Sequence, residues 1–195
     1  MSLAAFQTAL ARLIIEPEYR DRVRAGGDAA PPGDLDDVER ARLLSIAADP
    51  GLDVNRTLHK GFRLGKLRAL LPLTCRLLGS RALMREVAAF WSVRRPSGFY
   101  FLPEALEFCD FLATRGLRAR YIREIVDFER ASLELQRARF DAPPPQVVRF
   151  DHDPGALLGA VASGRRPRAI PRRRCVAVAR RDAGGEVQWQ ISEEP

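Results

Sequence analysis

The sequence predicts an α+β protein: a mainly helical N-terminal domain over residues 1–140, followed by a small β-rich subdomain over residues 147–195. Two observations support this prediction. In the first part, apolar residues recur every three or four positions, as they do on one face of an amphipathic helix. Beyond "DAPPPQ" (141–146) they recur every second position, as in a strand with one buried face. The three prolines between the two parts form a stiff linker.

The first 50 residues predict two helices that are separated by a loop. The first helix has an apolar face of Phe6, Leu10, Leu13 and Ile14. The segment "AGGDAAPPGD" (25–34) is rich in glycine and proline and reads as the loop. Asp34 is the expected N-cap of the second helix, because its side chain can accept a hydrogen bond from a free backbone N–H. The buried side of that helix should hold Leu35, Val38, Leu43 and Ile46.

Further helices follow between residues 53 and 140. The spacing of Val54, Leu58 and Phe62 predicts a helix from Asp53, which Pro72 interrupts. A short helix then closes at Gly79, and another begins with Ser80 as its N-cap. Pro103 should open the next helix at its first position, and Gly116 should stop it. The last long helix is expected over residues 118–140.

The C-terminal part predicts three strands and one helix. "VVRF" (147–150) is the first strand, and residues 153–164 form a short helix with Asp153 as N-cap and Pro154 at the first position. "RCVAVAR" (174–180) and "EVQWQIS" (186–192) both alternate, and the glycine-containing "RDAGG" (181–185) joins them as a hairpin loop.

Almost all of the excess positive charge lies in one segment, "RRPRAIPRRRCVAVARR" (165–181). It contains eight of the 32 basic residues and no acidic one, while the rest of the chain has 24 basic and 25 acidic residues. In its second half, the strand pattern would put Arg174, Val176, Val178 and Arg180 on one face, and the small residues between them on the other. Such a strand fits an edge that arginines guard against aggregation, or an edge that pairs with an acidic peptide.

The remaining composition excludes several classes of protein. No apolar run approaches the length of a membrane span, and the N-terminus has no signal-peptide pattern, so we expect no membrane association. Cys75, Cys109 and Cys175 are odd in number and far apart, which favours free thiols in a reducing compartment over disulfides or a zinc site. The expected location is the cytoplasm.

We find no self-contained active site and no common nucleotide-binding or hydrolase motif. The most suggestive cluster is Asp151–His152–Asp153, whose side chains could ligate a metal. A strand end followed by a helix cap explains the same residues better, because neighbours on an extended segment rarely converge on one ion. We therefore expect no catalytic residue and no metal site in this chain.

A second basic feature lies on the helix that begins near Asp53. Arg56, Lys60 and Arg63 recur at helical spacing and form a positive stripe. Such a stripe is usually a solvated face, and a phosphate contact is the alternative. No helix-turn-helix pattern accompanies it.

Several motifs between residues 3 and 140 resemble those of a known family. They are "FQTALARLI" (6–14), Asn55 at a helix start, Leu71–Pro72, "LLG" (77–79), the apolar Leu83–Phe90 region, "FLPEALEFCDFLATRG" (101–116), and "YIREIVDFERA" (121–131) with Tyr121 and Glu129 at the matching positions. This set is similar to a bacterial family long labelled as DNA-binding, which includes the HvfC and methanobactin-biosynthesis partner proteins. The arginine run at the C-terminus does not match a motif of that family.

The resemblance implies a non-catalytic subunit. Members of the family are partner proteins of multinuclear non-heme iron oxidative enzymes that modify ribosomally made precursor peptides. In the methanobactin branch, the partner forms a heterodimer with the iron enzyme and helps to capture the leader peptide. The iron and the oxidation of peptide cysteines belong to the other subunit, so the resemblance implies no cofactor in this chain.

The leading hypothesis is thus a partner subunit that binds a leader peptide by strand addition on its C-terminal sheet. The expected peptide-binding residues are Arg172, Arg173, Arg174, Val176, Val178, Arg180 and Arg181. The helical domain would dock the iron enzyme, with Arg56, Lys60, Arg63, Phe99 and Tyr100 as candidate contacts. The alternative is a DNA-binding regulator, for which the basic segment would be the contact and affinity would fall steeply with salt.

Overall fold

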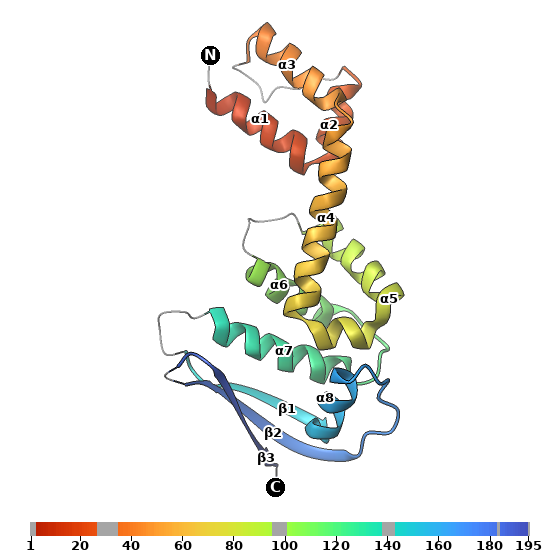
Figure 1. Ribbon diagram of the computed structural model, residues 1–195, viewed down its shortest axis with the longest axis vertical. Coiled ribbons are helices and arrows are strands. Elements are labelled where there is room, and N and C mark those ends of the chain that lie inside the picture. Colours follow the sequence, from red (N-terminus) through yellow and green to blue (C-terminus); the bar gives the residue numbers. More distant parts are fainter. Residues whose placement is uncertain (1–2, 27–34, 95–100, 138–142, 183, 195) are drawn as a thin grey trace. The chain divides into compact units, whose positions relative to one another are not determined.

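The computed structural model confirms the α+β class: helices make up the N-terminal part, and a three-stranded antiparallel sheet lies near the C-terminus (Figure 1). The structure describes residues 3–26, 35–94, 101–137, 143–182 and 184–194. By packing, the chain divides into two compact units, Met1–Arg63 and Leu64–Pro195. Within the described residues, no helix is both long and apolar enough to cross a membrane.

The first unit contains α1 (Leu3–Ile15), α2 (Pro17–Arg24), α3 (Asp37–Ala48) and most of α4 (Gly51–Leu70). Its core consists of Ala9, Leu13, Tyr19, Val23, Leu35, Leu43 and Ala47. Helix α3 begins with a capping box, in which the Asp36 carboxylate accepts from the Glu39 N–H and the Glu39 carboxylate accepts from the Asp36 N–H. The predicted N-cap, Asp34, lies outside the described residues.

Some apolar side chains of this unit that helical spacing predicts to be buried are exposed. Ile14 and Val38 are exposed, although both were expected on buried faces. The spacing of Val54, Leu58 and Phe62 predicted the helix α4 correctly, and all three side chains are exposed on it, Leu58 to 67%. Spacing shows which side chains share a face of a helix, but it does not show whether another element covers that face.

The helices of the second unit pack around one apolar core. After the end of α4 come α5 (Pro72–Val93), α6 (Phe101–Thr114) and α7 (Ile122–Arg137). Helix α5 is interrupted at Gly79, whose φ of 70° and ψ of 164° are not helical, so the predicted break at this glycine is confirmed. Helix α6 begins two residues before Pro103, the predicted first residue.

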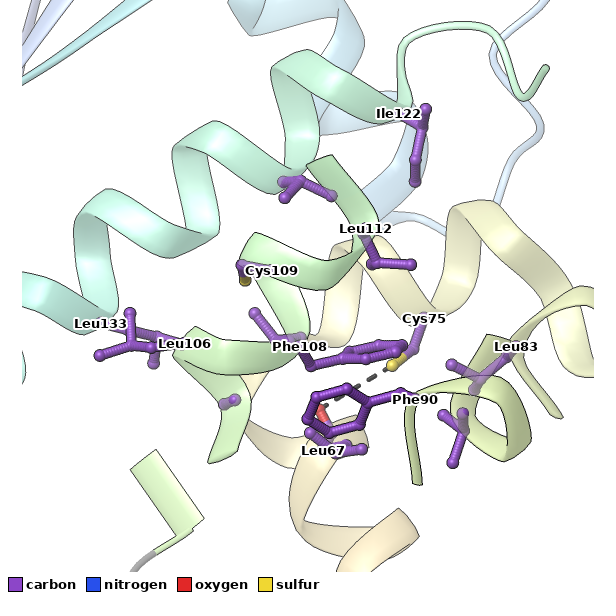
Figure 2. Packing of buried hydrophobic residues seen from close by; sticks show 14 residues of the cluster. Leu67, Cys75, Leu83, Phe90, Leu106, Phe108, Cys109, Leu112, Ile122 and Leu133 are labelled. Carbon is purple, nitrogen blue, oxygen red and sulfur yellow. Dashed lines mark hydrogen bonds between the residues drawn. The ribbon is translucent and has the colours of Figure 1, made fainter. Parts of the chain in front are cut away.

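Aromatic rings fill the centre of this helical core (Figure 2). The centroids of the Phe90 and Phe108 rings lie 5.2 Å apart and the rings are tilted by 54°, within the range of centroid distances typical of aromatic pairs. The Cys75 thiol lies against the Leu67 carbonyl oxygen at 3.8 Å. Both cysteines of this core, Cys75 and Cys109, are buried free thiols.

The sheet consists of β1 (Gln146–His152), β2 (Arg172–Arg181) and β3 (Val187–Glu193), and α8 (Pro154–Ala162) joins the first two strands. Helices α7 and α8 cover one face of it (Figure 1). The core beneath them includes Tyr121, Ile125, Val148, Phe150, Leu157, Val161, Cys175 and Ala177. Helix α7 therefore packs against the helical core on one side and against the sheet on the other.

This packing places the sheet in the same unit as α5, α6 and α7. The proline segment near residue 143 marks the change from helix to strand, whereas the units divide at Arg63. The division into a helical domain over residues 1–140 and a β-rich subdomain over residues 147–195 stays a prediction.

A buried carboxylate joins α7 to α5. Glu129 on α7 is 5% exposed, and its two oxygens accept the backbone N–H groups of Leu73 and Thr74 at 2.7 and 2.8 Å. These N–H groups belong to the first turn of α5 and have no acceptor within the helix. The carboxylate also lies at the positive end of the helix dipole. Glu129 thus caps α5 from another helix.

We predict that Glu129→Ala lowers the free energy of unfolding by about 2–4 kcal/mol, because it leaves one buried and one partly buried N–H donor unsatisfied. Urea denaturation of the whole chain measures this effect. Asp110→Ala is the matched control: its exposed ion pair with Arg130 should contribute less than about 1 kcal/mol. Equal losses in the two variants would contradict the capping role.

The ionisation of Glu129 should make stability depend on pH. Burial raises the pKa of Glu129, while hydrogen bonds from Thr74 and Leu73 act in the opposite direction. The folded chain then holds this proton more tightly than the unfolded chain, so ionisation lowers the free energy of unfolding as the pH rises through the raised pKa. Glu129→Gln cannot titrate here. The stability of the wild type relative to this variant should therefore decrease with rising pH in urea titrations, and a constant or increasing difference would contradict the shift.

Candidate functional site

The arginine-rich strand β2 is the middle strand of the sheet. It pairs antiparallel with β1 on one side and with β3 on the other. The prediction that "RCVAVAR" forms an edge strand is therefore wrong, because both of its backbone edges are occupied. Val176 and Val178 cannot accept an added strand, and strand addition has to use an outer strand.

The predicted alternation of β2 side chains is confirmed. Cys175, Ala177 and Ala179 are buried towards the helices, whereas Val176 and Val178 are partly exposed on the other face, which we call the outer face. Register extends this face to the neighbouring strands: Val147 and Gln190 lie opposite Val178, and Arg149 and Ser192 lie opposite Val176. The outer face thus carries a central apolar strip.

Arginines flank this strip on β2. By alternation, Arg172, Arg174 and Arg180 belong to the outer face, and all three are exposed. Their side chains form no hydrogen bond or ion pair within the described part of the chain. Across β1, Arg149 lies 3.6 Å from a Glu194 carboxylate oxygen. The outer face therefore has uncompensated positive charge on both ends of the apolar strip.

The other two predicted arginines of β2 have partners within the chain. Arg173 binds the carboxylate of Asp153 at 3.0 Å and that of Glu193. The Arg181 Nε–H donates to the Gly185 carbonyl oxygen at 3.1 Å and so closes the β2–β3 turn. Both residues contribute to the structure of the sheet, and their charges are less available to a ligand than those of Arg172, Arg174 and Arg180.

A polar pocket of about 350 Å³ lies at one end of the outer face. Asp151, His152 and the three arginines at positions 172–174 line it. The His152 Nδ1 atom lies 2.8 Å from a carboxylate oxygen of Glu124 on α7, and the other Glu124 oxygen accepts the backbone N–H groups of Asp151 and His152. Glu124 therefore holds the end of β1, where the register with β2 shifts.

The Asp151–His152–Asp153 cluster has a structural role in this arrangement. Asp153 caps α8, because its carboxylate accepts the Ala156 N–H at 2.7 Å. This backbone hydrogen bond, followed by the one from Arg173, lowers the pKa of Asp153. Among the residues that the structure describes, no group of three potential metal ligands comes together here or elsewhere.

The outer strand β3 presents backbone donors away from β2. The Glu194 N–H donates to the Arg174 carbonyl oxygen, so this pair is hydrogen bonded. Hydrogen-bonded and non-hydrogen-bonded pairs alternate along an antiparallel ladder. The N–H groups of Ser192 and Gln190 therefore point to β2, and those of Ile191 and Trp189 point outward. At the His152 end of β1, Glu124 accepts the backbone N–H groups of Asp151 and His152, so that part of the β1 edge is covered.

Of the predicted enzyme-docking residues, the structure describes the side chains of Lys60 and Arg63. Lys60 is exposed on α4, but Arg63 is only 5% exposed, so its place in a solvent-exposed positive stripe is wrong. The side chain of Arg56, and Phe99 and Tyr100 as a whole, lie outside what the structure describes. The exposed apolar side chains of Val54 and Leu58 form a different surface on this helix.

Two residues that position the site had no local sequence signal for their role. Tyr121 has a φ of 68°, its hydroxyl accepts the Ile170 N–H at 3.2 Å, and its ring lies edge-on to His152 at 4.7 Å. Glu124 binds β1 as described above. The "YIREIVDFERA" motif contains both, but only the fold shows that they hold the segment before β2 and the end of β1.

A scan against protein-family models found no match for this chain, and a search of curated proteins found none either.

The three cysteines are buried and free, so they are poor nucleophiles. Burial raises the pKa of the Cys75 thiol to about 12, and it also raises the pKa of Cys109. We predict that the native protein reacts with a thiol reagent such as 5,5′-dithiobis(2-nitrobenzoate) far more slowly than the same protein in urea. Fast reaction of all three thiols in the native state would contradict their burial.

Proposed function

We propose that this chain is a non-catalytic partner subunit of an iron-dependent oxidative enzyme that modifies a ribosomally made precursor peptide, and that it binds the leader of that peptide. The family resemblance over residues 3–140 supports this proposal. The iron and the oxidative chemistry would reside in the enzyme subunit. The present chain would contribute recognition and would form a heterodimer with the enzyme.

The observation that carries the peptide-binding part is the arrangement of the C-terminal sheet. The outer strand β3 offers backbone N–H groups at Trp189 and Ile191, and the adjacent outer face carries Arg174 and Arg180 without ion-pair partners in the described residues. An extended peptide would add as a fourth strand at β3, where main-chain hydrogen bonds provide affinity. Acidic side chains of the peptide would reach Arg180, which pairs with Gln188 of β3.

The apolar strip of the outer face would add side-chain selectivity. A strand beside β3 has alternate side chains on the same face as Gln190 and Ser192. This face also includes Val176 and Val178, so the peptide-binding role of these two valines would be through side-chain contact, and not through their backbone. A leader with acidic residues near alternating apolar ones fits this surface best.

The helical part would dock the enzyme. Exposed Val54 and Leu58, one turn of α4 apart, provide apolar area, and exposed Lys60 provides a positive charge elsewhere on the same helix. These residues take the place of Arg63 as candidate contacts.

Co-expression tests the proposed function as a whole. The full chain is tagged and expressed together with two products of neighbouring genes: a multinuclear non-heme iron oxidase and the precursor peptide of that oxidase. The tagged chain is then purified. We expect the oxidase to co-purify, and the leader peptide to bind in calorimetry. Failure to retain either component, together with tight binding of duplex DNA at physiological salt, would overturn the proposal in favour of a DNA-binding regulator.

Substitution of Ile191 tests strand addition. Ile191→Pro removes an outward N–H while the N–H groups that donate to β2 stay, and proline is tolerated at such edge positions. We expect leader-peptide affinity to fall by about tenfold or more, since the added strand loses a main-chain hydrogen bond and is sterically blocked.

Ile191→Ala is the matched control, because it shortens the same half-exposed side chain but keeps the N–H. Its affinity should stay close to that of the wild type. Unchanged binding by Ile191→Pro, with circular dichroism showing an intact fold, would exclude β3 as the pairing edge.

A further inference from the structure

A second arginine-lined pocket lies between α5 and the segment that follows α8. Its volume is about 380 Å³, and it shares no residue with the pocket at the end of the outer face. Four arginines line it, namely Arg76, Arg81, Arg165 and Arg166. The first two come from α5 and the others from the beginning of the arginine-rich segment, so arginines 84 or more positions apart in the sequence meet here.

The backbone geometry of two segments builds this pocket. Helix α5 is interrupted at Gly79, and α8 ends just before Gly164, which also has a positive φ of 73°. The Arg76 guanidinium connects the two segments, because its Nη1 atom donates to the Ala162 carbonyl oxygen at 2.5 Å. The pocket is therefore bounded by two turns that are held together by a hydrogen bond.

The charge of the pocket is not compensated. No aspartate or glutamate is among the described residues that line it. Arg165 donates only to the Ser163 hydroxyl, and the side chains of Arg81 and Arg166 form no hydrogen bond or ion pair within the described part of the chain. Gathering four guanidinium groups without a counter-charge raises the free energy through repulsion, and an anion bound among them removes this cost.

We infer that this pocket binds a polyvalent oxyanion, either a phosphate-type group or clustered carboxylates. Guanidinium groups bind both by paired, charge-assisted hydrogen bonds, and Arg81 and Arg166 have these donors free. Leu77, Leu78 and Pro167 supply apolar surface for the carbon atoms next to the charged groups. No aromatic side chain is present among the described lining residues, so the pocket offers no platform for stacking a base.

Calorimetry on the full chain tests this inference with two probes. Inorganic pyrophosphate represents the phosphate source, and a blocked pentapeptide of alternating aspartate and glutamate represents the carboxylate source. We expect at least one probe to bind and its affinity to fall as salt is added. The double variant Arg81→Gln/Arg166→Gln should bind that probe at least about tenfold more weakly, because two charge-assisted contacts are lost.

Arg123→Gln provides the matched control. It removes one exposed arginine of α7 that is outside the pocket, so affinity should not change. Because Arg81 and Arg166 are exposed, their replacement should leave the fold intact, and circular dichroism checks this. Binding of neither probe to the wild type, or equal weakening by Arg123→Gln and by the double variant, would overturn the assignment.

The inference does not depend on the proposed partner function. Ile191→Pro changes the sheet edge and should leave pyrophosphate or pentapeptide binding in this pocket unchanged. The double arginine variant should still co-purify with the iron oxidase. Failure of the anion site and failure of the partner function are therefore separate results.

Discussion

The packing of the second unit depends on the hydrogen bonds that the Glu129 carboxylate accepts from the start of α5, because they fix α7 relative to α5. A buried carboxylate needs hydrogen-bond donors, and the free N–H groups of Leu73 and Thr74 at the start of α5 supply them. Pro72 sets this helix start, since it occupies the first helical position and needs no acceptor for an N–H. With α7 held there, its opposite face is in place to receive the sheet.

The sheet can approach α7 closely because the inward residues of its middle strand are small. Ala177 and Cys175 face the core, and bulk is supplied from the flanks by Phe150 and by Phe128 of α7, which stacks on Trp189 at 4.4 Å. A middle strand that had large residues inward would push α7 away and separate Glu124 from β1. The small residues of "CVAVA" therefore support the site from below, while the valines between them form the outer face.

Local patterns predicted most of the elements, although they missed α2, but they did not predict which elements are neighbours in space. Alternation predicted the faces of β2, and Gly79 marked the break in α5, because both signals lie within a few residues. The prediction of β2 as an edge strand was wrong, since the alternation of its side chains is the same whether one or both of its edges are paired. The roles of Glu124 and Glu129 were also hidden, because each binds backbone groups 27 or more residues away.

The arginine-rich segment is held at several points, and this explains how one run of charge can serve two places. Between its two arginine groups, the Ile170 N–H donates to the Tyr121 hydroxyl, and the Pro171 carbonyl oxygen accepts the Asp153 N–H. Arg120 in turn donates to the Arg168 carbonyl oxygen.

The charges on either side of these anchors therefore belong to an ordered backbone. Ordered charges lose less conformational entropy when a ligand binds than charges on a free tail would. A segment that composition alone would class as a basic tail is instead part of the folded surface, with Arg165 and Arg166 directed to one pocket and Arg172 and Arg174 to another.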